Sequence, residues 1–158
     1  MCIRDRLEGH RQSGGAFNQA SVVIVAYSGG YHSAAYALDR GGANHRIKGV
    51  ILLDALYGDE DKFANWFSAR RRQAFLLSAY TDSTKDENAT LQGLLTKKRI
   101  PFTKTMPRTL SPGTAAFIGT GGLDMHGDFV TRAWQPDPLE KALAMIPGYG
   151  LVRAKKGA

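Results

Sequence analysis

The sequence of 158 residues has only one cysteine, Cys2, and no long run of apolar residues. A single cysteine excludes an internal disulfide and any zinc site built from several thiolates. No segment approaches the roughly 18 consecutive apolar residues of a membrane-spanning helix, so we expect no membrane span. Residues 1–6 also lack the apolar stretch of a signal peptide. The sequence therefore assigns no location, and the cytoplasm is the default expectation.

Acidic residues are fewer than basic ones, 14 against 21, which gives a formal net charge of +7. The basic residues cluster at Arg70–Arg72, Lys97–Arg99 and Lys155–Lys156. Each cluster lies near an expected helix C-terminus or the chain end, where cations complement the helix dipole and stay solvated. No aromatic residues alternate with them, as they do in single-strand-binding surfaces. We therefore expect no nucleic-acid partner.

The sequence does have the composition of one globular domain, with 43% apolar and 22% charged residues. Residues 7–20 are polar and show no convincing period, so we expect a leader outside the core at 1–20. Within this leader, residues 1–6 blend poorly with the residues after them and are a candidate translation scar. We expect the folded domain at 21–150 and a basic tail at 151–158.

Apolar runs alternate with helical patterns along this domain. We expect four strands: one that begins at Val22, and three more at Ile47–Leu53, Ala74–Tyr80 and, with a weaker pattern, Pro101–Met106. We expect four helices. The first runs from about Tyr31 to Arg40, and the second begins at a cap, Asp59 or Asp61, and carries the aromatic stripe Phe63, Trp66 and Phe67. The third carries Leu91, Leu94 and Leu95 on one face, and the fourth begins at Asp137-Pro138. The region 107–137 is expected to be a long functional loop. This alternation predicts an α/β fold with a mainly parallel sheet and helices on both faces.

The most informative segment is residues 22–38, which read VVIVAYSGGYHSAAYAL. An apolar strand here leads through Ser28, Gly29 and Gly30 directly into a helix of small residues. A serine on so tight a strand-to-helix turn is held out from the sheet edge, above the N-terminus of the helix. Its hydroxyl can attack a substrate there, and backbone N–H groups can receive an anion. The turn is therefore compatible with acyl transfer and with phosphate binding.

Acyl transfer by a serine requires a base and a carboxylate that orients the base. Of the four histidines, His10 and His45 lie in a leader and a surface loop, and His32 is fixed on the helix after the serine. His126 follows Ser28 in the chain on a glycine-flanked loop, which can reach the carboxyl ends of the strands. We therefore take His126 as the candidate base. Asp54 and Asp82 each follow an expected strand and are candidate acids.

From Ser21 to about Pro147 the chain resembles the C-terminal half of an α/β-hydrolase. Residues 26–30 (AYSGG) resemble the nucleophile elbow Gly-x-Ser-x-Gly, with Ala26 in place of the first glycine, and residues 126–129 (HGDF) resemble the histidine loop. The tyrosine after the elbow, together with residues 53–58 (LDALYG), is similar to a bacterial group of predicted hydrolases.

This resemblance implies that Ser28 is the nucleophile, His126 the general base and the Gly29 N–H an oxyanion donor. It offers Asp82 or Asp54 as the triad acid, with a preference for Asp82, because the family most often places the acid after that strand. It implies no metal or organic cofactor and an ester or amide as the small-molecule substrate.

A complete hydrolase of this family has further strands before the elbow, one of which leads to a second oxyanion donor. We therefore interpret the chain as a truncated hydrolase with an incomplete oxyanion hole. Missing strands would also leave an exposed sheet edge, which would favour self-association.

Two alternatives remain open. Residues 28–33 (SGGYHS) also resemble the Ser-Gly-Gly-x-Asp-Ser loop of ATP pyrophosphatases, which binds pyrophosphate on backbone N–H groups. In this chain His32 occupies the position of the aspartate, and the His126 loop would have no role. The other alternative is a non-catalytic α/β domain.

Overall fold

The structure is a computed structural model that describes residues 20–121 and 124–149. Four strands and four α-helices alternate along these residues, with two short 3₁₀ helices near the carboxyl ends of the strands. In chain order the elements are β1 (Val22–Tyr27), α2 (Gly30–Arg40), β2 (Ile47–Leu53), α3 (Glu60–Arg70), β3 (Phe75–Tyr80), η2 (Asp82–Thr84), α4 (Lys85–Lys97), β4 (Ala115–Gly119), η3 (His126–Val130) and α5 (Pro138–Ala144). The predicted first three strands and four helices are confirmed in position.

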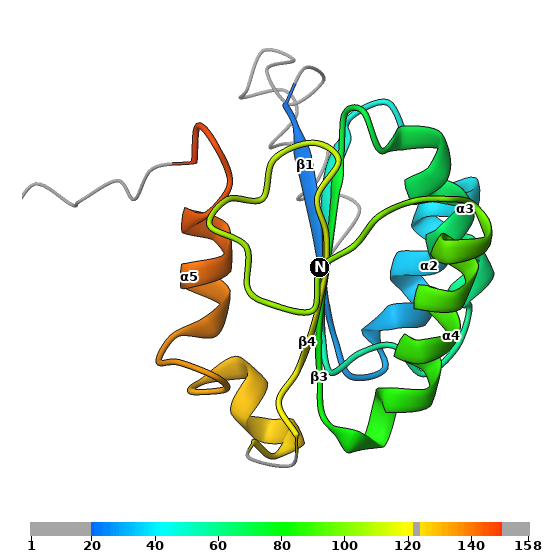
Figure 1. The fold of residues 1–158 in the computed structure, drawn as a ribbon. Helices are drawn as coiled ribbons and strands as arrows, with labels where there is room; N and C mark the ends of the chain where they lie inside the picture. Colours follow the sequence, from blue (N-terminus) through cyan, green and yellow to red (C-terminus); the bar gives the residue numbers. More distant parts are fainter. Residues whose placement is uncertain (1–19, 122–123, 150–158) are drawn as a thin grey trace, which may run out of the picture.

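The four strands form one parallel sheet in the order β1-β2-β3-β4. Parallel neighbours are joined by right-handed crossovers, and a sheet that grows in one direction then places every crossover helix on the same face. Helices α2, α3 and α4 accordingly cover one face, while η3 and α5 cover the other (Figure 1). The predicted α/β fold with helices on both faces is confirmed.

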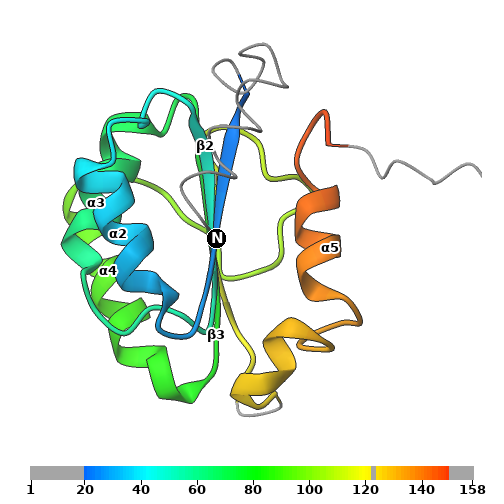
Figure 2. The same cartoon turned by 180° about the vertical axis from the view of Figure 1, so that it is seen from behind.

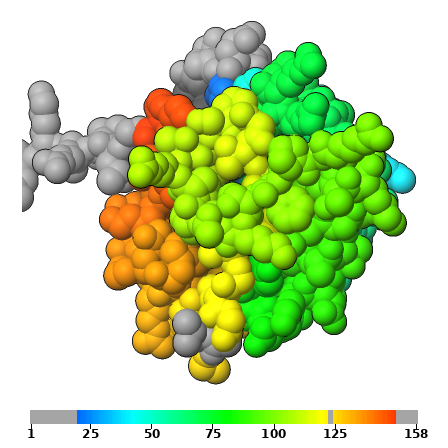
Figure 3. Space-filling view, viewed as in Figure 1, coloured from blue at the N-terminus to red at the C-terminus, as the bar shows by residue number. Residues whose placement is uncertain are grey.

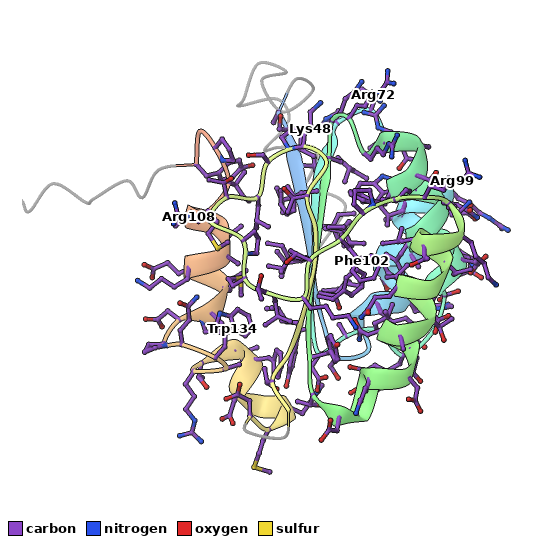
Figure 4. The ribbon with its side chains drawn as sticks, in the orientation of Figure 1. Lys48, Arg72, Arg99, Phe102, Arg108 and Trp134 are labelled. Carbon is purple, nitrogen blue, oxygen red and sulfur yellow. The ribbon has the colours of Figure 1, made fainter. Side chains whose placement is uncertain are left out.

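Each face of the sheet carries its own apolar core. Along β2, Val50 and Leu52 pack toward α2, α3 and α4, whereas Ile51 and Leu53 pack toward α5. A strand buried on both faces is apolar without alternation, which explains its continuous run of large aliphatic residues. The predicted aromatic stripe of α3 is confirmed as packing: it consists of Phe63, Trp66 and Phe67, all buried in the first core. In Figure 4, Phe102 and Trp134 lie on opposite sides of the sheet, and each packs against the core of its own side.

The prediction of the fourth strand was wrong. It lies at Ala115–Gly119, inside the region expected to be a loop, and not at Pro101–Met106. Only Thr103 of the earlier segment pairs with the sheet: its N–H donates to Ala115 and its carbonyl accepts from Phe117, both at 2.9 Å. The rest of the segment crosses from the α4 side to the α5 side over the β4 edge (Figure 3). Small residues and a short length weakened the signal of β4 in the sequence.

Strand β1 forms the other edge of the sheet, which faces the viewer in Figure 2. Among the described residues no strand pairs with β1 on the side away from β2. Its side chains are correspondingly less buried than those of β2 and β3. Ser28 follows the last residue of this edge strand, so the proposed nucleophile lies at a corner of the sheet.

No helix in the described part of the chain has the length and apolar character needed to cross a membrane.

Candidate active site

Ser28 lies in a strained turn between β1 and α2. Its backbone has a positive φ of 55°, which is uncommon for a residue with a side chain and costs on the order of 1–3 kcal/mol. The small residues Ala26 and Gly30 face each other across the turn: a Cβ added to Gly30 would lie 3.6 Å from the Ala26 methyl, an ordinary van der Waals contact. Ser28 itself is partly exposed. This geometry is typical of a nucleophile elbow.

Gly29 and Gly30 open helix α2 directly behind the serine, and both are exposed. The first N–H groups of a helix have no acceptor within it, and they carry the positive end of its dipole. They can therefore hold a developing negative charge next to Ser28, which is the role that the sequence suggests for Gly29.

Asp54 follows β2, the strand next to β1, and is fully buried. Its backbone is also left-handed, with a φ of 44°. The carboxylate accepts hydrogen bonds from the Thr81 N–H (2.9 Å) and from the Thr84 hydroxyl (2.9 Å). The Thr81 hydroxyl lies 3.0 and 3.1 Å from its two oxygens. The loop after β3 therefore holds this carboxylate in one orientation.

The pKa of Asp54 is lowered by these contacts. Burial alone would raise the pKa of a carboxyl, but the hydrogen bonds from Thr81, His126 and Thr84 outweigh this effect. Asp54 is therefore an anion at neutral pH, although its side chain is shielded from solvent.

His126 is a further partner of this buried carboxylate. Its Nδ1 lies 2.6 Å from Asp54 Oδ2, the shortest contact that the carboxylate makes. Such a contact places the proton on Nδ1 and leaves Nε2 as the basic nitrogen. Nε2 has no hydrogen-bond partner in the described part of the chain, and 38% of the side chain is exposed.

The backbone around His126 is held at several points. Phe129, three residues later in η3, is fully buried in the core on the α5 side. The Asp128 carboxylate accepts from the Met125 N–H at 2.8 Å, and Asp124 accepts from the Trp134 N–H at 2.9 Å. These two aspartates therefore cap backbone groups, and the imidazole is carried on an anchored turn.

Two tyrosines flank the imidazole. Tyr27 stacks on its face, with ring centroids 4.8 Å apart and an interplanar angle of 22°. The Tyr27 hydroxyl also donates to the backbone carbonyl of His126 at 3.3 Å. Tyr57 approaches from the edge at 6.4 Å and is exposed.

No hydrogen bond joins Ser28 to His126 within the described residues. The two residues are connected through Tyr27, which precedes the serine and stacks on the imidazole. Hydrogen bonds between catalytic groups are often long before a substrate binds. The structure thus brings the serine turn, the histidine and a buried carboxylate to one corner of the sheet.

The structure places Asp54, and not Asp82, against His126. Asp82 begins η2 with an exposed side chain, and its neighbours Thr81 and Thr84 orient Asp54 instead. The geometry therefore favours Asp54 as the acid, whereas the sequence analysis preferred Asp82. The contacts of the two threonines with Asp54 and of Tyr27 with His126 were not predicted from the sequence, although the polar run after β3 was a usable signal for the threonines.

The other histidines lie elsewhere. His32 is paired with Asp59 at 2.8 Å on the exposed side of α2, and His45 lies in an exposed loop. His10 falls outside the described residues. Where the structure is described, no group of three or more histidine, cysteine or acidic side chains could hold a metal ion.

Comparisons with known proteins return no relative: no protein-family model, no curated protein and no solved structure matches the chain significantly.

Proposed function

We propose that this protein is a serine hydrolase that acts on an ester or amide carbonyl. The observation that carries the proposal is the 2.6 Å contact between His126 and the buried Asp54, next to a left-handed Ser28. A buried carboxylate that orients a half-exposed imidazole is the arrangement that turns a serine hydroxyl into a nucleophile.

In the proposed reaction, His126 Nε2 takes the Ser28 hydroxyl proton while Oγ attacks the substrate carbonyl carbon. The Gly29 N–H at the start of α2 stabilises the oxyanion. The imidazolium then gives its proton to the leaving alcohol or amine, which departs and leaves an acyl group on Ser28. Water, deprotonated by the same nitrogen, releases the acid and restores the serine. Asp54 stays ionised throughout and stabilises the imidazolium.

The oxyanion site limits the expected rate. Removal of one donor from such a site typically costs on the order of 10²–10³ in rate. Among the described residues we assign only the Gly29 N–H to this role, so we expect ordinary esters to turn over slowly. A fluorophosphonate is a more sensitive reagent, because its fluoride leaves more readily than an alkoxide.

The proposal is tested by the reaction of the protein with a fluorophosphonate probe. We expect Ser28 Oγ to form a bond to phosphorus, with loss of fluoride and transfer of the serine proton to His126. Peptide mass mapping should locate the label on Ser28. The Ser28→Ala variant should show no label, and the His126→Ala variant should react much more slowly.

Ser33 provides a matched control, because it lies on the exposed side of the same helix. The Ser33→Ala variant should react like the wild type. Absence of any label on the wild-type protein would overturn the proposal, and binding of Mg-ATP by the same sample would then favour the phosphate-loop alternative.

A further inference from the structure

We propose that Tyr27 is a positioning residue that holds the His126 imidazole in its reactive orientation. The inference rests on the proposed function, because it takes His126 as the base. It concerns the residue directly before the serine, whose side chain the nucleophile elbow itself leaves unspecified.

Tyr27 contacts His126 at two independent points. Its ring covers the imidazole face at 4.8 Å and 22°, and its hydroxyl donates to the His126 backbone carbonyl at 3.3 Å. The first contact sets the plane of the imidazole, and the second fixes the turn that carries it. Both contacts depend on the orientation of the two groups, which packing alone would not require.

The two contacts complement the one made by Asp54. The carboxylate fixes the Nδ1 edge of the imidazole at 2.6 Å, but a single hydrogen bond allows the ring to swing about that edge. Stacking on Tyr27 restricts this swing. Among the described residues, the one further titratable side chain in contact with the ring is Tyr57, whose hydroxyl is 3.5 Å from Nδ1. With both restraints in place, Nε2 has a defined direction.

The position of Tyr27 in the chain links this restraint to the nucleophile. Residues alternate between the faces of a strand, and Tyr27 projects to the α5 side, where η3 lies. The next residue is Ser28, at the turn. A displacement of the β1 end would therefore move the serine and the surface on which the imidazole stacks together. Their relative position is kept without a direct bond between them.

Two substitutions separate the contacts. Tyr27→Phe keeps the stacked ring and removes the hydroxyl, whereas Tyr27→Leu removes both. We expect the fluorophosphonate labelling rate to fall about 2- to 5-fold in Tyr27→Phe, the size of effect that one neutral hydrogen bond supports. In Tyr27→Leu we expect a fall of about 10- to 100-fold, as misplacement of a catalytic group produces. Tyr36→Phe and Tyr36→Leu are the matched controls on α2 and should label at the wild-type rate.

A second readout does not depend on activity. The His126 Hε1 proton resonance, assigned by its loss in His126→Gln, should be shifted upfield by the ring current of Tyr27. We expect it to stay shifted in Tyr27→Phe and to move downfield in Tyr27→Leu, while both variants keep a cooperative thermal transition. An unlabelled wild type would refute the proposed function but leave this resonance to decide the positioning role. An unmoved resonance, or wild-type labelling in Tyr27→Leu, would overturn the inference itself.

Discussion

The described residues include two histidine–aspartate pairs of almost equal length but very different surroundings. His126 and Asp54 are 2.6 Å apart, and His32 and Asp59 are 2.8 Å apart. In the first pair the carboxylate is completely buried and the histidine is 38% exposed. In the second, the histidine is 63% exposed and the aspartate 15%, and Asp59 also binds Lys62. Distance alone therefore does not distinguish a candidate catalytic pair from a surface ion pair.

The difference lies in what else the carboxylate contacts. Asp54 is held by backbone and hydroxyl donors that carry no charge, so among the described residues His126 is its one potentially cationic partner. The pKa of Asp59 is lowered chiefly by its hydrogen bond to Lys62, with His32 contributing less. His126 thus faces a fully buried carboxylate in a low-dielectric site, whereas the largely exposed His32 shares its carboxylate with a lysine.

The largest expected difference between the pairs is in reactivity. Asp54→Asn should lower the fluorophosphonate labelling rate by about 10³–10⁴-fold, because the amide favours the wrong imidazole tautomer. Asp59→Asn should leave the rate within about 2-fold of the wild type, since surface charge pairs contribute little. The comparison requires rate constants from time courses of labelling. Equal losses in the two variants would show that the surroundings do not separate the pairs.

A smaller difference is expected in stability. Asp54→Asn places an amide N–H₂ among buried donors, which should lower the free energy of unfolding by about 1–3 kcal/mol. Asparagine tolerates the left-handed backbone at both positions, so strain does not confuse the comparison. Asp59→Asn should cost about 0–1 kcal/mol. Urea unfolding measures both values, and a larger cost at Asp59 would contradict the account.

The smallest expected difference is in acid sensitivity. Because the folded-state pKa of Asp54 lies below the ordinary value of 3.8, its stabilising contribution is complete above that pH. The contribution is lost as the pH falls through the lower, folded-state pKa. The gap in melting temperature between wild type and Asp54→Asn should therefore be constant near neutrality and should narrow below about pH 4. A difference in melting temperature that increased in acid would contradict a lowered pKa of Asp54 in the folded state.

The sequence was sufficient to predict the helices and strands that have strong apolar patterns. It was not sufficient to predict how these elements are arranged relative to one another. The run of large aliphatic residues in β2 does not alternate with polar residues, which is typical of a strand covered on both faces, so this strand was predicted correctly. Strand β4 was missed because its five residues, AAFIG, are mostly small and lie between turns. Pro101–Met106 was predicted as the strand instead, but of this segment only Thr103 pairs with β4, in an isolated bridge to Ala116.

The site shows the same limit. Ser28 and His126 were proposed from local context alone, since neighbouring residues encode the turn that carries one and the glycine-flanked loop that carries the other. The choice between Asp54 and Asp82 depends on which strand lies next to β1, and neighbouring positions in a sheet are set by packing between distant segments. In the structure β2 is that neighbour, and Ser28 N–H donates to Leu53 of β2 at 3.4 Å. Asp54 follows Leu53 and is carried to the same corner.

The central claim is that Asp54 acts on Ser28 through His126, and a double-mutant cycle tests it most directly. Labelling rates are compared for wild type, Asp54→Asn, His126→Ala and the double variant. Residues that act as one unit are strongly non-additive, so the account predicts that the double variant reacts no more slowly than His126→Ala alone. Rate losses that multiply would contradict the account, because Asp54 would then act on the serine without the histidine.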